Sequence, residues 1–165
     1  MNQHKTAPPV DATPTASGMH NRNDVQHFEG LRLDEQIGHL VRRVHQRCSA
    51  VFQARIGDEQ ITPTQFAALV KLEEATELSQ NHLGRLTAMD PATTQGVIRR
   101  LLDRRLVATR DDADDRRRTL ISLSPQGRAL VRRLLPNAPE ISNTVLAPLT
   151  PAERTTLVAL LKRLG

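Results

Sequence analysis

Apolar residues recur three and four positions apart along most of this chain, and they alternate with polar residues in one short region. The longest helical pattern runs from about Leu33 to Ile56. Its expected buried face carries Ile37, Leu40, Val41, Val44, Cys48, Val51 and Phe52. This spacing is typical of an amphipathic helix that packs one stripe against other elements.

Three helix starts follow close together. Thr62 and Gln65 have the spacing of a capping box around Pro63, which suits the first position of a helix. Ser79 and Asp90 are the expected N-caps of two further helices, because short polar side chains accept hydrogen bonds from the free N–H groups of a first turn. Short helices joined by a tight turn, the second of them polar, predict a helix-turn-helix.

The alternating pattern comes directly after the helix that begins at Asp90. Residues 106–110 and 119–123 favour two strands, and residues 111–118 between them form a highly charged turn. A helix followed by a two-stranded ribbon is the outline of a winged helix-turn-helix. There the helix enters a DNA major groove and the ribbon contacts the backbone or minor groove. The expected fold class is mainly α with a small two- or three-stranded β-wing.

The helix that begins at Asp90 separates two kinds of side chain. Its expected apolar stripe holds Val97, Ile98, Leu101 and Leu102. Its other faces carry Thr93, Thr94, Gln95, Arg99, Arg100, Arg104 and Arg105. Hydroxyl and amide groups near the start of the helix suit base edges, and the arginines further along suit phosphates. Taken alone, the pattern fits a solvated basic surface helix equally well.

The predicted wing favours a nucleic-acid contact over a solvated surface helix. Arg116, Arg117 and Arg118 follow Asp114 and Asp115 at the turn. A charged cluster by itself usually indicates a solvated turn, but on a hairpin next to a basic helix it favours contact with nucleic acid. Asp115 is expected to hold the guanidinium of Arg117 in place.

The helical patterns at the two ends of the chain have more apolar surface than one small winged helix needs. We expect residues 31–56 and 125–165 to form a dimerisation region, because leftover apolar faces must be buried. A two-fold dimer would place two recognition helices about 10 bp apart, or a multiple of that. Residues 61–124 would be the winged helix-turn-helix lobe. Residues 1–30, rich in Pro, Thr and Ala, would be a disordered tail.

Composition limits the classes of function that the protein can have. The chain has 165 residues, enough for one domain, and a net charge of +5, which favours an anionic partner. Its single cysteine excludes an internal disulfide and a multi-cysteine zinc site. The scarcity of aromatic residues argues against binders that stack single-stranded bases.

The sequence holds no Gly-rich phosphate loop, metal-ligand cluster or nucleophile motif, so we expect neither an enzyme nor a cofactor nor a bound metal. It also lacks a membrane-length apolar run and the apolar core of a signal peptide. A cytoplasmic protein is therefore expected.

Three basic side chains lie on or beside the apolar face of the first helix. At about 100° per residue, Arg55 falls near the centre of that face, and His45 and Arg47 fall on its flanks. Such groups pair with a carboxylate or extend to water, or they bind the carboxylate of a small ligand. Cys48 lies within the stripe and is expected to be a core cysteine.

The chain resembles the MarR family of bacterial transcription regulators over about Leu31 to Gly165. The most specific match is the wing, DDADDRRRTLISLSPQGR; the others are ITPTQFAALVKL, LGRLTAMDPATTQGVIRRLLDRRLV and LTPAERTTLVALLKRL. The resemblance implies a homodimeric repressor that binds an inverted-repeat operator in double-stranded DNA and is released by a small ligand. It implies base contacts at Thr93, Thr94, Gln95 and Arg99, and minor-groove contacts at Arg116 and Arg117. Arg100 and Arg118 complete the expected DNA-binding set.

The segment TAMDPATTQGVIRRL is most similar to the branch that responds to nicotinate-type aromatic acids. The family's ligand pocket lies between the dimer helices and the DNA-binding lobe. The resemblance therefore implies an aromatic carboxylate bound where His45, Arg47, Arg55 and Phe66 converge.

Two positions depart from the family pattern. Arg105 stands where the family often has glycine, and Gly96 stands where an arginine is common, so the turn into the wing and the operator code need not be shared. The absence of tyrosine argues against peroxide sensing through Cys48. The alternative function is a winged-helix protein-interaction module without specific DNA binding.

Overall fold

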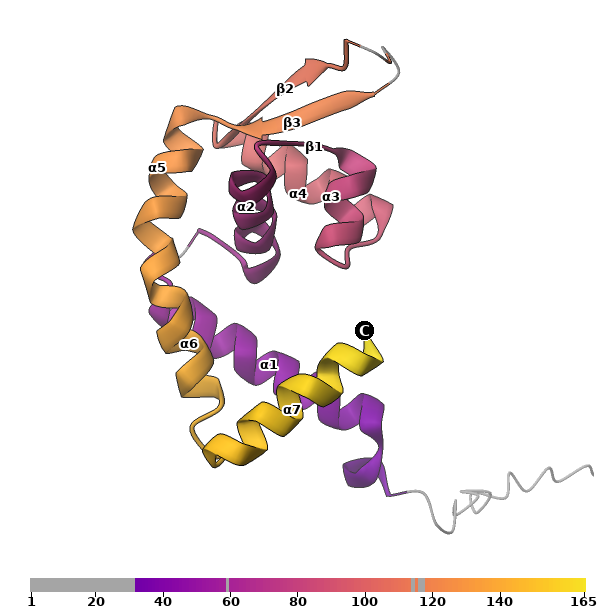
Figure 1. Ribbon diagram of the computed structural model, residues 1–165, viewed down its shortest axis with the longest axis vertical. Coiled ribbons are helices and arrows are strands. Elements are labelled where there is room, and N and C mark those ends of the chain that lie inside the picture. The colour runs from indigo at the N-terminus through magenta and orange to yellow at the C-terminus, as the bar shows by residue number, and fades with distance from the viewer. Residues whose placement is uncertain (1–31, 59, 114, 116–117) are drawn as a thin grey trace, which may run out of the picture. The chain divides into compact units, whose positions relative to one another are not determined.

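A computed structural model of the chain describes residues 32–58, 60–113, 115 and 118–165 (Figure 1). The expected tail of residues 1–30 lies outside the described residues, as do Arg116 and Arg117 of the wing. Residues 34–165 form one compact unit, and all the packing described below lies within it.

The described residues are mainly helical, with a small antiparallel sheet, as the sequence predicts. In chain order the elements are the 3-10 helix η1 (Leu33–Glu35), α1 (Ile37–Arg55), α2 (Pro63–Ala75), β1 (Glu77–Ser79), α3 (Gln80–Leu86), α4 (Pro91–Asp103), β2 (Val107–Asp111), β3 (Thr119–Leu123), α5 (Pro125–Leu134), the 3-10 helix η2 (Leu135–Asn137), α6 (Ala138–Val145) and α7 (Pro151–Leu164). One predicted boundary was wrong. The first helix was expected from about Leu33, but Leu33–Glu35 is the 3-10 helix η1 and α1 begins at Ile37.

The predicted helix caps are confirmed. Thr62 Oγ1 accepts a hydrogen bond from the N–H of Gln65 at 3.3 Å, and Gln65 Oε1 accepts one from the N–H of Thr62 at 2.9 Å. Ser79 caps α3, and Asp90 Oδ1 accepts from the N–H of Thr93 at 2.9 Å at the start of α4. Local sequence therefore fixes where the helices of the helix-turn-helix begin.

The sheet has the strand order β1-β3-β2 within the described residues. Leu78 lies opposite Ile121, and Val107 lies opposite Leu123, and all four side chains are buried. This face of the sheet packs on α2, α3 and α4, whose interior residues include Leu69, Leu72, Leu83, Val97 and Leu101. Alternation along the strands thus directs one set of side chains into a core shared with the helices.

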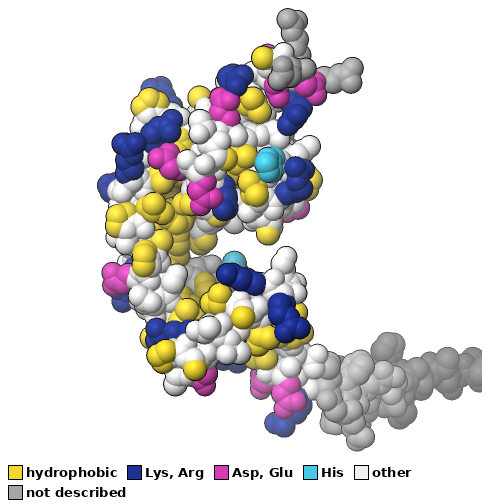
Figure 2. Space-filling view, in the orientation of Figure 1, with side chains coloured by type: hydrophobic (Ala, Val, Ile, Leu, Met, Phe, Trp, Pro, Cys, Tyr) yellow, Lys and Arg dark blue, Asp and Glu magenta, His cyan; other side chains and the backbone are white. Residues whose placement is uncertain are grey.

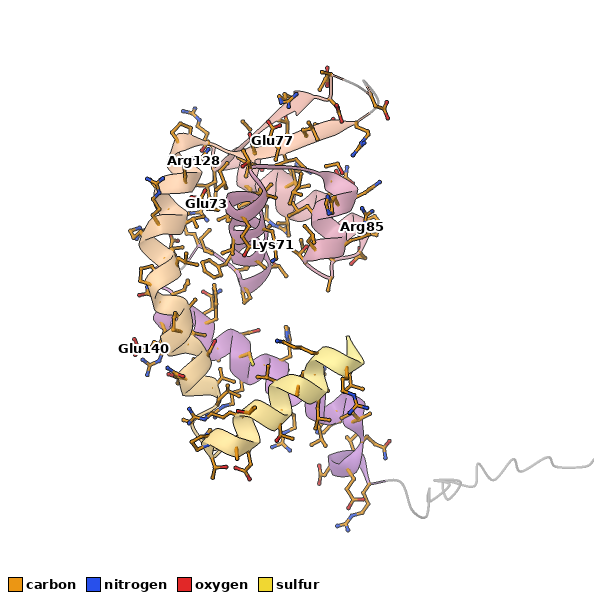
Figure 3. All side chains as sticks on the ribbon, viewed as in Figure 1. Lys71, Glu73, Glu77, Arg85, Arg128 and Glu140 are labelled. Atoms are coloured by element: carbon orange, nitrogen blue, oxygen red, sulfur yellow. The ribbon has the colours of Figure 1, made fainter. Side chains whose placement is uncertain are left out.

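Helix α5 closes the side of this core. Leu130, Val131 and Leu134 are buried in it, and Arg128 Nη1 donates to Glu73 Oε2 of α2 at 3.3 Å (Figure 3). We call α2, α3, α4, the sheet and α5 the winged lobe. Its core is covered mainly by its own elements, and Phe52 and Ile56 at the end of α1 complete it.

The terminal helices α1, α6 and α7 are packed differently. Helix α1 packs along α6, and Phe52 at its C-terminal end enters the core. The rest of its predicted apolar face is largely uncovered, and α7 contains no buried residue. Ile37 is 69% exposed, Val41 52% and Leu161 51%, and Figure 2 shows hydrophobic side chains at the surface of these helices.

Candidate nucleic-acid interface

The start of α4 is rigidly capped. The hydroxyl and the N–H of Thr93 both donate to the Asp90 carboxylate, and these hydrogen bonds lower the pKa of Asp90. A charged cap at this end also interacts favourably with the partial positive charge of the helix N-terminus. The exposed first turn of α4 is therefore held in a fixed conformation.

Helix α4 presents a polar face to the surface. Thr93, Gln95, Arg99 and Arg100 are all exposed, as the sequence predicts. They combine a hydroxyl, an amide and two guanidinium groups within two turns. These groups can donate to base edges and to phosphates at the depth of a major groove.

Thr94 is a correction to the predicted DNA-contact set. Its side chain is 1% exposed, and Oγ1 donates to the backbone oxygen of Asp90 at 2.8 Å. It lies against Gly84 of α3, where an added Cβ would come within 2.8 Å of the Thr94 hydroxyl. Thr94 therefore joins α3 to α4 from the inside and does not lie on the exposed face.

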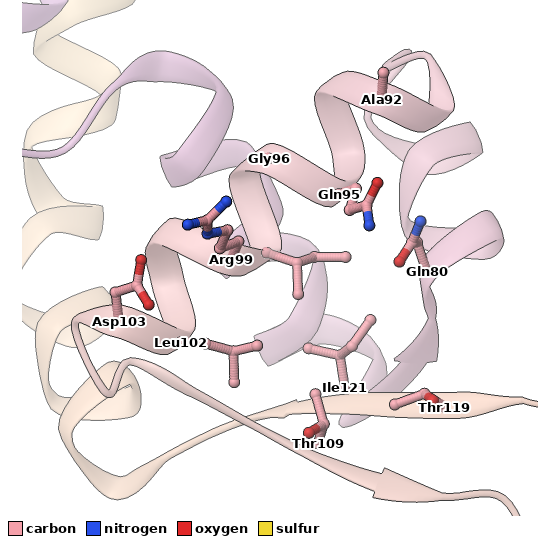
Figure 4. Close-up of a pocket in the computed structure, with 11 residues that line it drawn as sticks. Gln80, Ala92, Gln95, Gly96, Arg99, Leu102, Asp103, Thr109, Thr119 and Ile121 are labelled. Carbon is pink, nitrogen blue, oxygen red and sulfur yellow. The ribbon is translucent and has the colours of Figure 1, made fainter.

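A groove of about 620 Å³ runs between α4 and the wing, the hairpin of β2 and β3 with the turn between them (Figure 4). Its lining includes Gln80, Gln95, Arg99, Asp103, Thr109 and Thr119. Leu102, expected in the buried stripe, is 37% exposed and lies in this groove. The groove adds Gln80, Thr109 and Thr119 to the candidate residues, which no sequence motif had indicated.

An ion pair fastens the wing to the rest of the lobe. Arg110 of β2 donates through Nε to Glu77 Oε1 at 2.9 Å and through Nη2 to Glu77 Oε2 at 2.6 Å. The bond from Arg110 lowers the pKa of Glu77 and raises that of Arg110. Because Glu77 lies in β1 and Arg110 in β2, this two-point contact spans the central strand β3.

The described end of the wing also carries a basic side chain. Arg118 is exposed just before β3, and its Nε lies 3.9 Å from Asp112 Oδ2. The expected contact between Asp115 and Arg117 falls on a residue outside the described ones.

The four residues predicted to bind a ligand do not all meet. His45 lines a groove of about 380 Å³ between α1, α6 and α7, together with Cys48 and Phe52. Arg47 Nη2 lies 3.5 Å from the backbone oxygen of Thr144, and Arg55 pairs with Glu140 of α6.

Phe66 of α2 packs on Phe52, with ring centroids 5.6 Å apart. The groove therefore contains His45 from the predicted set. Arg47, Arg55 and Phe66 lie outside its lining.

Comparison with known proteins agrees with this geometry. A model of the MarR family matches residues 59–118. The HTH-type transcriptional repressor NicR of Pseudomonas putida is 38% identical over 130 residues, which cover 79% of this chain and 82% of NicR. The chain belongs to the MarR family. The resemblance stated from the sequence is thus confirmed over most of this MarR-family protein.

Two solved structures extend the comparison. A probable transcriptional regulator from Pseudomonas aeruginosa is 51% identical, with a TM-score of 0.78, and the match covers 81% of this chain and all of the other. BpsR of Bordetella bronchiseptica, whose DNA binding is regulated by 6-hydroxynicotinic acid, is 43% identical with a TM-score of 0.72. That match covers 79% of this chain and 98% of BpsR. The fold of this MarR-family protein is therefore shared with a probable transcriptional regulator and with a DNA-binding protein.

The described residues also bear on membrane insertion and metal binding. No helix there has the length and apolarity needed to cross a lipid bilayer. Nor does the described part of the chain contain three or more His, Cys, Asp or Glu side chains grouped to hold a metal ion.

Proposed function

We propose that this MarR-family protein is a homodimeric repressor of transcription. It binds an inverted-repeat operator in double-stranded DNA and is released by a small aromatic carboxylate, for which a hydroxylated nicotinate is the first candidate. The observation that carries the proposal is the exposed polar face of α4, with Gln95 and Arg99 beside a groove bounded by the wing.

Helix α4 is the proposed recognition helix. Thr93, Gln95 and Arg99 would contact base edges in the major groove, because a glutamine amide matches adenine and a guanidinium matches guanine. Arg100 and Arg118 would contact phosphates, and Arg116 and Arg117 would reach the minor groove, as the family resemblance implies. Thr94 is left out because it is buried.

The terminal helices are the proposed dimerisation region. Their exposed apolar residues include Ile37, Leu40, Val41 and Val44 on α1 and Val158, Leu160, Leu161 and Leu164 on α7. Apolar faces of this extent are typical of helices that pack against a second chain. We therefore assign α1, α6 and α7 to dimer contacts. Helix α5, which the sequence placed with the dimerisation region of residues 125–165, buries Leu130, Val131 and Leu134 in the winged lobe, so we assign it with residues 61–124 to the DNA-binding lobe.

The groove beside α1 is the proposed effector site. It is mainly apolar, and His45 is a polar group in its lining that can donate to a carboxylate. Arg55 already has a carboxylate partner in Glu140, so an effector would have to replace Glu140 to reach it. We place the aromatic ring near Cys48 and Phe52 and its carboxylate at His45. The regulation of BpsR by 6-hydroxynicotinic acid and the similarity to NicR support this choice of ligand.

The DNA-binding part is tested with an operator selected from genomic fragments by the purified protein. Gln95→Ala should weaken operator binding by about 5- to 150-fold, since a good base contact is worth about 1–3 kcal/mol. Arg132→Ala, an exposed change on α5 away from the α4 groove, is the control and should leave binding within about two-fold. Equal affinities of wild type and Gln95→Ala would contradict the role of α4.

The effector part is tested by calorimetry with 6-hydroxynicotinic acid and by its effect on operator binding. A coupling free energy of about 1–3 kcal/mol gives a 5- to 150-fold loss of operator affinity. His45→Ala should abolish this response, and His39→Ala on the same helix should keep it. Arg47→Ala and Arg55→Ala should keep a normal response, because neither side chain lines the groove. A normal response in His45→Ala would move the site elsewhere.

The alternative function, a protein-interaction module, is distinguished by the strength, sequence preference and salt dependence of DNA binding. Binding through several phosphates weakens with a log–log slope of about −0.9 per phosphate neutralised, because counterions are released from the DNA. A protein-interaction module would bind DNA weakly and without sequence preference.

A further inference from the structure

The short connection between α1 and α2 is contacted by side chains from three other elements. Arg133 of α5 donates to the backbone oxygen of Gly57 at 3.3 Å and to Asp58 Oδ2 at 3.1 Å. Asn137 of η2 donates to the backbone oxygen of Ile56 at 2.9 Å. Gly57 has φ +83°, a conformation that favours glycine, and an added Cβ would lie 3.3 Å from the Asn137 amide. Residues 56–58 of this connection are thus held by side chains of α5 and η2.

The third contact comes from the end of the proposed recognition helix. Arg104, the C-cap of α4, donates to the backbone oxygen of Gln60 at 2.9 Å, and its Nη2 lies 3.7 Å from Asp58 Oδ2. The other carboxylate oxygen of Asp58 accepts from the N–H of Gln60 at 3.0 Å. One carboxylate therefore faces arginines from both α4 and α5.

The burial of these groups distinguishes them from ordinary surface ion pairs. The Asp58 side chain is 15% exposed and that of Arg104 is 27% exposed, whereas Arg133 is 59% exposed. Ion pairs that are partly removed from water are screened less by salt and hold their geometry better than exposed pairs. The pair between Asp58 and Arg104 is thus the less exposed of the two, whereas Arg133 lies closer to Asp58 Oδ2, at 3.1 Å against 3.7 Å.

We infer that Asp58 is a positioning residue for the recognition helix and acts through Arg104. The first turn of α4 is fixed from inside by Thr94 against Gly84. The last turn is fixed by the Asp58 clamp, which we define as Asp58, Arg104 and Arg133. With both ends held, the exposed face of α4 has one orientation on DNA. This inference rests on the proposed function, because an orientation on DNA matters when α4 reads bases.

The test is operator binding by the full-length Asp58→Asn variant. Asparagine keeps an acceptor for the N–H of Gln60 but removes the charge that both arginines face. Affinity for the selected operator should fall by about 3- to 30-fold, the range typical of residues that act through a neighbour. Removing a negative charge near DNA would by itself strengthen binding, so a loss of affinity has the opposite sign to the simple electrostatic effect.

Two readouts separate positioning from a general loss of stability. Binding to non-operator DNA should not weaken, and the salt slope on the operator should stay that of the wild type, since no phosphate contact is removed. A variant that was merely less stable would show a lower melting temperature and an equal loss on both DNAs. That outcome would overturn the inference.

A double-mutant cycle shows which arginine transmits the effect of Asp58 on operator affinity. The losses from Asp58→Asn and Arg104→Met should be strongly non-additive, because both break the same contact. In operator affinity, Asp58→Asn should couple less strongly to Arg133→Met, because Arg133 lies on α5 and not on α4. The hydrogen bond between Arg133 and Asp58 should couple these two changes in stability instead. Arg104→Met alone should also reduce operator affinity without changing the salt slope, which keeps the inference testable if Asp58→Asn fails to fold.

Two results would contradict the clamp while leaving the proposed function intact. One is wild-type operator affinity in Asp58→Asn. The other is equal coupling of Asp58 to Arg104 and to Arg133. Failure of the wild-type protein to select any operator would instead overturn the proposed function, and the positioning role with it.

Discussion

The winged lobe and the terminal helices have similar hydrophobic patterns in the sequence but very different surroundings in the fold. In the lobe, Leu69, Leu72 and Leu101 are fully buried against elements of the same chain. On the terminal helices, residues at equivalent helical spacing such as Val41 and Leu161 are about half exposed. An amphipathic pattern therefore predicts that a face will be covered, but it does not say whether the cover comes from the same chain.

The largest expected effect comes from a charge on the uncovered face. Val41→Glu should prevent dimer formation and weaken binding to a two-site operator by about 10²- to 10⁴-fold, the gain that linkage of two sites provides. Gln46→Glu introduces the same charge at an exposed polar position of α1 and is the control. Light scattering and operator titration measure both properties. A monomeric Val41→Glu variant with full operator affinity would show that dimerisation is not needed.

The next largest effect is on stability, when a glycine is replaced by alanine in the winged lobe and in a terminal helix. A Cβ at Gly127 in α5 would lie 1.9 Å from the backbone oxygen of Leu106, so Gly127→Ala should destabilise the protein by about 1–3 kcal/mol or more. A Cβ at Gly38 in α1 has no described heavy atom within 4 Å, and Gly38→Ala should stabilise by up to about 1 kcal/mol. Urea unfolding checks both. Similar changes in the two variants would contradict the difference in packing between the regions.

A smaller effect is expected inside α4, the proposed recognition helix. Thr94→Val removes the hydrogen bond to the Asp90 backbone oxygen, which keeps its bond from the N–H of residue 94. Stability should fall by about 0.5–1.5 kcal/mol, with operator affinity of the folded protein unchanged. Unfolding and binding curves on the same sample provide the test. A loss of affinity as large as that of Gln95→Ala would restore residue 94 as a base contact.

The smallest effect concerns acid pH and the wing. Because Glu77 has a lowered pKa in the folded protein, its contribution to stability is present above the ordinary glutamate pKa and is lost as pH falls through the lower folded value. The urea midpoint of the wild type should decline in that range, and Glu77→Gln should decline less steeply. Asp90 and Glu153 also have lowered pKa values and contribute to the remaining decline in both proteins. Parallel pH profiles for the two proteins would contradict this role of the Glu77–Arg110 pair.

The sequence predicted the helix starts and the wing because these depend on neighbouring residues. The caps at Thr62, Ser79 and Asp90 are confirmed, as is the pair of strands around the charged turn. A third strand was allowed for, but its residues were not predicted. The three residues of β1 are too few for an alternating pattern, and the strand forms by pairing with distant β3. Contacts made across long sequence separations, such as Arg110 with Glu77, carry no local signal.

The misplacement of Thr94 could have been avoided. It precedes Val97, Ile98 and Leu101 by three, four and seven positions, which puts it on the same face of α4 as these buried residues. Because threonine is polar, Thr94 was assigned to the exposed face. A threonine hydroxyl can nevertheless be buried when it donates to a backbone oxygen of its own helical turn. The separation of Arg47 and Arg55 from the groove had no such signal, since it depends on where α6 places Glu140 and Thr144.

The most direct test of the central claim is footprinting of the selected operator at two salt concentrations. A dimeric repressor that reads bases through α4 predicts protection of an inverted repeat with half-sites one or more helical turns apart. Affinity should fall steeply with salt, in proportion to the number of phosphates contacted. Diffuse protection without a repeat, with no sequence preference at low salt, would contradict the assignment of α4 as a recognition helix.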